Sequence, residues 1–160
     1  MQSQKRSKKG SKKARISAAR LAAAQAVYQA ISSEQSFPTV VREYLDHRLA
    51  KNLDEEHDML LPDGNLFQDV VTGVGKRVQD LSDMIQENLQ KGKQGSETRP
   101  PEPLLMSILL CGAYELMAHH DTDAPIIISD YVDVAHAFYS DSEAGLVNAI
   151  LDKIKTQIRD

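Results

Sequence analysis

Positive side chains crowd the start of the chain. Eight of the 19 lysine and arginine residues fall within the first 20 positions, ahead of the first acidic residue, Glu34. They are Lys5, Arg6, Lys8, Lys9, Lys12, Lys13, Arg15 and Arg20. Ammonium and guanidinium groups pair readily with phosphate oxygens. Because only 11 basic residues remain to face all 23 acidic residues, the segregation indicates nucleic acid or an acidic surface as partner.

The same basic residues allow two other interpretations. A solvated tail could serve solubility alone, and a lysine cluster also serves as a nuclear address. A basic mitochondrial presequence would spread arginines along an amphipathic helix, whereas here lysines are clustered.

The search for catalytic or metal-binding groups is largely negative. His119 and His120 are adjacent, so on a helix their side chains diverge by about 100° and do not share a metal. The carboxylates of 54–58 indicate a solvated acidic turn. The Gly-x-Gly of 73–75 lies among valines, where glycine permits close helix packing rather than cradling phosphate. The sequence predicts a binding protein that is not an enzyme, with no metal and no cofactor.

Composition favours one soluble cytoplasmic domain. The chain has 160 residues, 41% of them hydrophobic, which is enough for a core. No apolar run approaches the ~18–20 residues of a membrane span. The single cysteine, Cys111, fits a reducing compartment and a buried position.

The first half of the chain shows helical periodicity throughout. We expect a disordered basic tail over 1–13 and a helix over 14–31, rich in alanine. A second helix is predicted over 39–53, with Thr39 as its N-cap. A long helix over 65–91 repeats apolar residues at spacings of three and four.

The second half follows a linker of glycine, proline and charged residues over 92–103. Residues 104–120 are apolar nearly all round, which predicts a central helix that buries Leu110 and Cys111. The run 126–128 is interpreted as a lead-in to a helix over 129–139. The last helix begins at a Ser140–Glu143 capping box. The fold class is all-α, as one domain over 14–160 with subdomains over 14–91 and 104–160.

Five segments of the chain carry a specific pattern: RLAAAQAVY at 20–28, AYEL at 113–116, DAP at 123–125, ISDYVDVAHAF at 128–138 and VNAILDK at 147–153. Together these segments resemble the NusB family of bacterial transcription antitermination factors. Their order and spacing match from about residue 15 to residue 153, which is nearly all of the foldable chain.

The resemblance implies a fold of two packed helical bundles with about six to seven helices. It also implies binding to boxA-type single-stranded RNA of ribosomal RNA transcripts, together with NusE, a small-subunit ribosomal protein. The pair acts within the antitermination complex of RNA polymerase.

Carried over by residue, the resemblance adds Arg20, Gln25, Tyr28 and Asn148 to the candidate RNA-binding residues. Gln25 and Asn148 would bond base edges or backbone, and Arg20 would pair with phosphate. Tyr28 alternatively packs between helices, and Asn148 alternatively caps or bridges helices.

This sequence departs from the family pattern at three places. The family usually has Lys-Phe before the Val-Asn of the last helix, where this chain has Gly145 and Leu146. It usually has an arginine where this chain has Leu110, and Asn-Glu where this chain has SD at 129–130. The lost lysine and aromatic are groups that would neutralise phosphate and stack on a base. The lysine-rich tail would compensate with phosphate contacts that do not depend on sequence.

Two other functions stay open. A NusB-like protein docking module would bind RNA only weakly. The RNA-binding appendage of a ribosomal RNA cytosine methyltransferase resembles NusB too, but the 160 residues leave no room for a methyl-donor domain.

Overall fold

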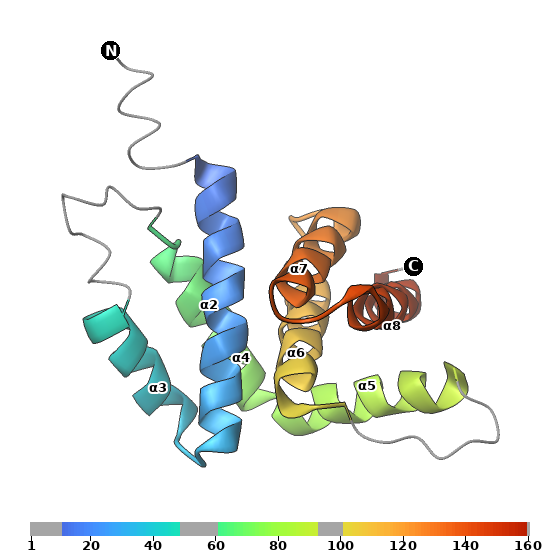
Figure 1. Ribbon diagram of the computed structural model, residues 1–160, viewed down its shortest axis with the longest axis horizontal. Coiled ribbons are helices and arrows are strands. Elements are labelled where there is room, and N and C mark those ends of the chain that lie inside the picture. Colours follow the sequence, from blue (N-terminus) through green and yellow to red (C-terminus); the bar gives the residue numbers. More distant parts are fainter. Residues whose placement is uncertain (1–10, 49–60, 93–100, 160) are drawn as a thin grey trace. The chain divides into compact units, whose positions relative to one another are not determined.

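Every regular element of the computed structural model is helical over the residues that it describes, 11–48, 61–92 and 101–159. They are α2 (Lys12–Ser32), α3 (Phe37–Glu43), the π-helical η1 (Tyr44–Arg48), α4 (Gly64–Lys76), α5 (Val78–Gly92), α6 (Pro103–Ala118), α7 (Ala124–Phe138) and α8 (Asp141–Arg159) (Figure 1). The predicted all-α class is confirmed. The chain divides into two compact units, Met1–Thr72 and Gly73–Asp160.

The first unit is organised around α2. Its buried side is almost entirely alanine, with Val27, and α3 packs against this helix. Alanine adds little apolar area, but its small size lets neighbouring backbones approach closely. The ring of Tyr44 in η1 stacks on Phe67 of α4, with ring centroids 5.3 Å apart. This pair joins the segments on either side of 49–60.

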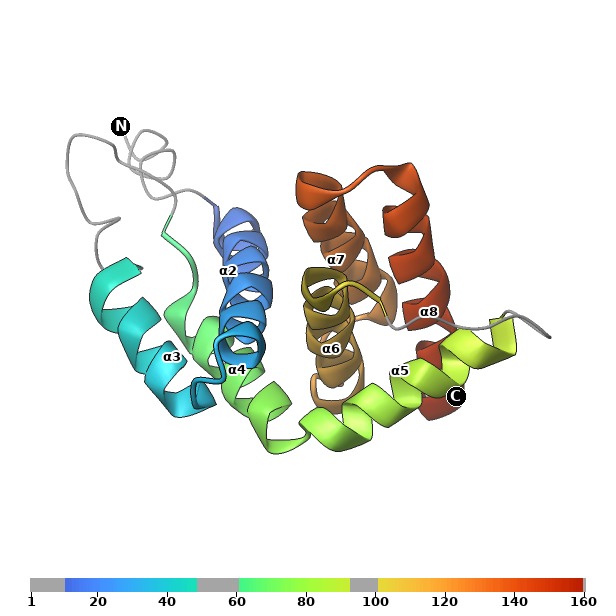
Figure 2. The same cartoon turned by 60° about the horizontal axis from the view of Figure 1, so that its bottom comes forward.

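The second unit is organised around α6, which contacts α5, α7 and α8. Figure 2 shows α6, α7 and α8 side by side, with α5 crossing one end of the group. Every residue of α6 from Ser107 to Leu116 is buried, including Leu110 at 1% exposure and Cys111 at 0%. The prediction of a central helix buried on all sides is confirmed.

Two charged side chains hold the end of α6. Glu115, the only charged residue of this helix, is fully buried and accepts hydrogen bonds from Tyr131 Oη at 2.5 Å and His119 Nδ1 at 2.9 Å. Arg159 donates to the carbonyl oxygens of Leu116, His119 and Thr122, each at 2.8 Å. A guanidinium satisfies carbonyls at a helix C-terminus and complements the helix dipole there. The last turn of α8 therefore fixes the turn that leads into α7.

Two predicted helix starts are wrong because an earlier residue caps the helix. The first helix begins at Lys12 instead of residue 14, since Ser11 Oγ accepts from the amide of Ala14 at 3.0 Å. The predicted tail thus loses Lys12 and Lys13 to α2. The second helix begins at Phe37, because Ser36 Oγ, not Thr39, supplies the N-cap acceptor. Proline in the first turn is compatible with this start.

The predicted lead-in over 126–128 is also wrong, because these residues already lie within α7. The helix begins at Ala124 with Pro125 in its first turn, where the missing amide hydrogen costs nothing. The last helix begins as predicted, and Ser140 Oγ donates to the Glu143 carboxylate at 2.8 Å.

The predicted single helix over 65–91 is two helices, α4 and α5, separated at Arg77. Two glycines in the last turn of α4 weaken the helix just before this break. A Cβ atom on Gly73 would overlap the ring of Tyr114, so this glycine permits close packing, as predicted. The division between the units also falls at Thr72 and Gly73, and not at the predicted linker over 92–103. The 49–53 end of the second predicted helix, the carboxylates of 54–58 and most of that linker lie outside the described residues.

Candidate nucleic-acid interface

The start of α2 concentrates positive charge. Lys12 and Lys13 are exposed, and no acidic residue occupies the first turn. The N-terminus of a 21-residue helix already carries partial positive charge from its free amide groups. Lysine side chains here interact unfavourably with the helix dipole. Their charges add to the partial positive charge of the helix end, so the local potential favours an anion. Lys5, Arg6, Lys8 and Lys9 lie outside the described residues.

Arg15 has a structural contact within the first unit. Its Nε donates to the carbonyl of Leu61 at 2.9 Å, and its own carbonyl accepts from the amide of Asp63 at 3.0 Å. Asp63 in turn accepts from the amide of Leu66 at 3.0 Å, which caps the start of α4. Arg15 therefore anchors the segment that leads into α4.

Arg20 lies on the buried side of α2. Its exposure is 3%, and its side chain has interactions within the protein, so it is not a free surface cation. The family resemblance made it a candidate phosphate ligand, which would require a side chain that reaches the surface. In this structure its surroundings are those of a structural arginine.

Gln25 and Tyr28 lie on the opposite side of the same helix. Both are exposed, Tyr28 at 40%, and Ser32 continues the row at the next turn. Spacings of three and four residues place these side chains on one face. Gln25, Tyr28 and Ser32 are called the α2 face below. Because Tyr28 is exposed, its ring is available to stack on a base.

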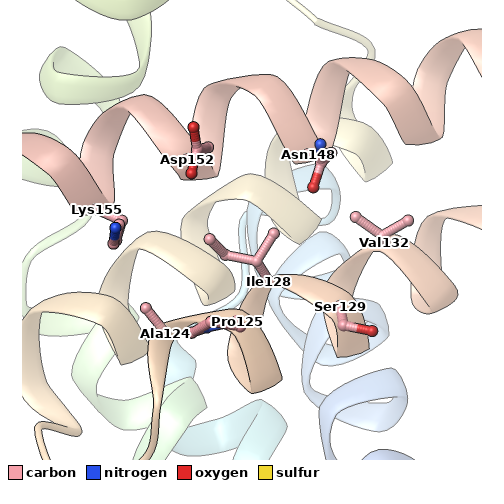
Figure 3. A pocket seen from close by; sticks show the side chains of 8 residues that line it. All are labelled: Ala124, Pro125, Ile128, Ser129, Val132, Asn148, Asp152 and Lys155. Carbon is pink, nitrogen blue, oxygen red and sulfur yellow. The ribbon is translucent and has the colours of Figure 1, made fainter.

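Asn148 belongs to the second unit, on α8. It is exposed, and no hydrogen bond of its side chain is found to the described residues, which disfavours the predicted alternative of a cap or bridge. It lines a groove of about 340 Å³ between α7 and α8 (Figure 3). The structure thus brings the α2 candidates together on one helix and places Asn148 in a separate local site.

The residues that sequence reasoning missed are Lys155 and Asp152, which line the same groove. The signal for both was helical spacing, since they follow Asn148 by seven and four residues on α8. The partners across the groove come from α7, and no sequence pattern indicated how these two helices pack.

The described residues contain no group of three or more side chains suited to hold a metal ion. None of the helices described is both long and apolar enough to cross a membrane.

These observations define a class of protein before any relative is considered. It is all-helical in its described part, with a basic leading helix whose free face carries a glutamine and an exposed tyrosine. The model of the NusB family matches residues 17–156, and the chain belongs to that family.

Its relatives include proteins named as transcription antitermination protein NusB. The one from Novosphingobium aromaticivorans is 38% identical over 142 residues, covering 89% of this chain and 93% of that protein. The one from Bradyrhizobium diazoefficiens is 40% identical over 146 residues, covering 91% and 86%. The solved structure of T. maritima NusB matches with a TM-score of 0.67 at 18% identity, covering 88% of this chain and 90% of that one. The last match shows a shared fold, and the family resemblance seen in the sequence is confirmed.

Proposed function

We propose that this protein is a transcription antitermination factor that binds boxA-type single-stranded RNA of ribosomal RNA transcripts. It binds this RNA together with NusE, in the antitermination complex of RNA polymerase in the cytoplasm, and catalyses no reaction. Membership of the NusB family supports this proposal, as do the names of the relatives.

The observation that carries the proposal is the α2 face. The opposite side of α2 is buried in the first unit, whereas Gln25 and Tyr28 are exposed further along the helix from its cationic end. A glutamine amide can donate to and accept from a base edge, and a tyrosine ring can stack on a base. Packing explains the alanines of this helix, but it gives no reason for an exposed tyrosine ring.

Charge and specificity have different sources in this proposal. Lys12, Lys13 and the preceding basic residues contact phosphates, which carry no sequence information. Preference for boxA must then come from side chains that reach bases, and Gln25, Tyr28 and Asn148 are the exposed candidates. Arg15 and Arg20 are assigned positioning roles because of their contact and burial.

The experiment is a competition titration at near-physiological salt with NusE present. Labelled boxA-type RNA is displaced by unlabelled boxA-type RNA or by a scrambled strand of the same composition. The double variant Gln25→Ala, Asn148→Ala should lose discrimination between the two strands, while affinity for the scrambled strand barely moves. The matched control is Gln68→Ala, Asn65→Ala, which removes an exposed glutamine and asparagine from α4.

If the wild type binds boxA-type and scrambled RNA equally well with NusE present, the antitermination proposal is wrong. The docking module would then take its place, with the substitution of Lys-Phe by Gly145 and Leu146 as the reason for lost RNA preference.

A further inference from the structure

The groove between α7 and α8 has two chemically different sides. The α7 side is mostly apolar and the α8 side is polar (Figure 3). The α7 residues that line it are Ala124, Pro125, Ile128, Ser129 and Val132, and the α8 residues are Asn148, Asp152 and Lys155. An apolar wall opposite a few convergent polar groups is the usual composition of a small-ligand site.

The polar groups are ordered along the groove. In Figure 3, Lys155, Asp152 and Asn148 form a row on α8, with Ala124 and Pro125 below the Lys155 end. Ser129 and Val132 lie below Asn148, and Ile128 lies between. Because Asn148 and Lys155 are seven residues apart, they share a helix face about 10 Å apart along the axis.

This order suits an anion at one end and a neutral hydrogen-bonding group at the other. Lys155 supplies the positive charge, and the N-terminus of the 15-residue α7 begins beside it. Asp152 in the middle repels an anion, so a phosphate is restricted to the Lys155 end. Asn148 and Ser129 at the other end can each donate and accept hydrogen bonds.

We infer that the α7–α8 groove binds a single unpaired nucleotide of the RNA. Its phosphate pairs with Lys155, its base lies on the apolar wall at Ile128, and the base edge faces Asn148. The inference rests on the proposed function and adds Lys155 and a defined site to it. A lone nucleotide is the class that fits because it combines one anion, one flat apolar surface and one polar edge.

Lys155 can replace the lysine that the family pattern has where this chain has Gly145. A Cβ atom on Gly145 would meet nothing within 4 Å, so no packing constraint demands glycine there. The family pattern has its lysine at this position, ahead of Asn148. In this chain Lys155, on the other side of Asn148, supplies a cation to the same helix. Lys155 is half-buried at the groove, whereas Lys153 two residues earlier is exposed and outside it.

Lys153 therefore provides a matched control for the test. Lys155→Gln and Lys153→Gln remove the same charge from the same helix, and both sites lie at the surface, so the fold should survive in each. Binding of boxA-type RNA with NusE is titrated over a series of salt concentrations. Lys155→Gln should lower the dependence of log affinity on log salt by ~0.7, the value for one phosphate contact on a single strand. Lys153→Gln should leave this slope unchanged.

A second measurement locates the base. RNAs of boxA type with one abasic position each are titrated against the wild type, Asn148→Ala and Lys155→Gln. At one position, removing the base should abolish the loss of affinity caused by Asn148→Ala, while the lower salt dependence caused by Lys155→Gln remains. The inference is overturned if Lys155→Gln and Lys153→Gln have the same slope of log affinity against log salt. It is also overturned if Asn148→Ala still lowers the affinity at every abasic position. If either occurs while the wild type still prefers boxA over scrambled RNA, the groove assignment alone fails.

Discussion

The helices α2 and α6 differ in how much of their surface the core uses. α6 buries 11 of its 16 residues, including large side chains on all sides, and leaves no continuous exposed face. α2 buries eight of its 21 residues, mostly alanines on one side, and keeps the α2 face open. A helix that is buried all round can only support the fold, whereas a helix that is buried on one side can also bind a partner. Substitutions in α6 should therefore change stability, and substitutions on the α2 face should change RNA binding.

The largest effect is expected at Leu110 of α6. Leu110→Ala should lower the free energy of unfolding by about 2–5 kcal/mol, because it leaves a cavity at a site that is 1% exposed. Denaturant unfolding measures this loss, and Leu110→Met, which keeps the volume, should cost less than about 1.5 kcal/mol. RNA affinity of the folded fraction should not change. A variant as stable as the wild type would show that α6 is less tightly packed than its burial indicates.

At Tyr28 we expect a loss of RNA affinity with little change in stability. Tyr28→Ala should weaken binding of boxA-type RNA by about 1–3 kcal/mol, since stacking of a base on an aromatic ring contributes this much. Because Tyr28 is 40% exposed, the free energy of unfolding should change little. Tyr28→Phe keeps the ring and should retain most of the affinity. Loss of stability without loss of affinity would instead support the helix-packing interpretation of Tyr28.

A smaller and less specific effect is expected from the residues that precede α2. Deletion of residues 1–10 removes Lys5, Arg6, Lys8 and Lys9 but keeps the Ser11 cap. Each phosphate contact that is lost should reduce the salt dependence by ~0.7. Affinity for boxA-type and scrambled RNA should fall together, because phosphate contacts do not read sequence. An unchanged slope would mean that these four charges do not contact RNA.

The sequence predicted helical structure for every described α-helix, but it did not predict the π-helical η1 and it placed several boundaries incorrectly. Periodicity identifies a buried face wherever the face is continuous, as in α6 and α8. Boundaries depend on which polar residue reaches a free amide, and Ser36 competes with Thr39 for that position. At α7 the apolar run 126–128 was interpreted as a lead-in, although Pro125 is compatible with a first helical turn. The break at Arg77 was missed because the apolar spacing continues through it, although Gly73 and Gly75 weaken the helix just before it.

The candidates on the folded body came from the family resemblance and not from helical spacing. Gln25 and Tyr28 are exposed on one face of α2, which is compatible with the role that the resemblance implies. The burial of Arg20 did not follow, because a charged residue is expected at the surface by default. Lys155 did not follow either, because its groove exists only where α7 packs against α8. Sites formed by two helices require knowledge of that packing.

The smallest expected effect concerns the N-terminal caps, which differ between α2 and α8. Ser11 caps α2 with a hydroxyl, which does not titrate, so Ser11→Ala should cost the same stability at every pH. At α8, hydrogen bonds from the Ser140 hydroxyl, from a backbone amide and from the Ser142 hydroxyl lower the pKa of the Glu143 carboxyl.

A folded-state pKa below the unfolded value stabilises the protein at pH above the unfolded value, and this stabilisation is lost as pH falls through the folded pKa. Glu143→Gln should therefore remove a small acid-dependent loss of stability below about pH 4.3. Urea unfolding of the wild type, Glu143→Gln and Ser11→Ala at pH 7 and at pH 3 measures the difference. The difference in the free energy of unfolding between the wild type and Glu143→Gln should become smaller at pH 3. The difference between the wild type and Ser11→Ala should stay constant. If both differences are constant, the charge of Glu143 contributes nothing to the start of α8, and the two caps are equivalent.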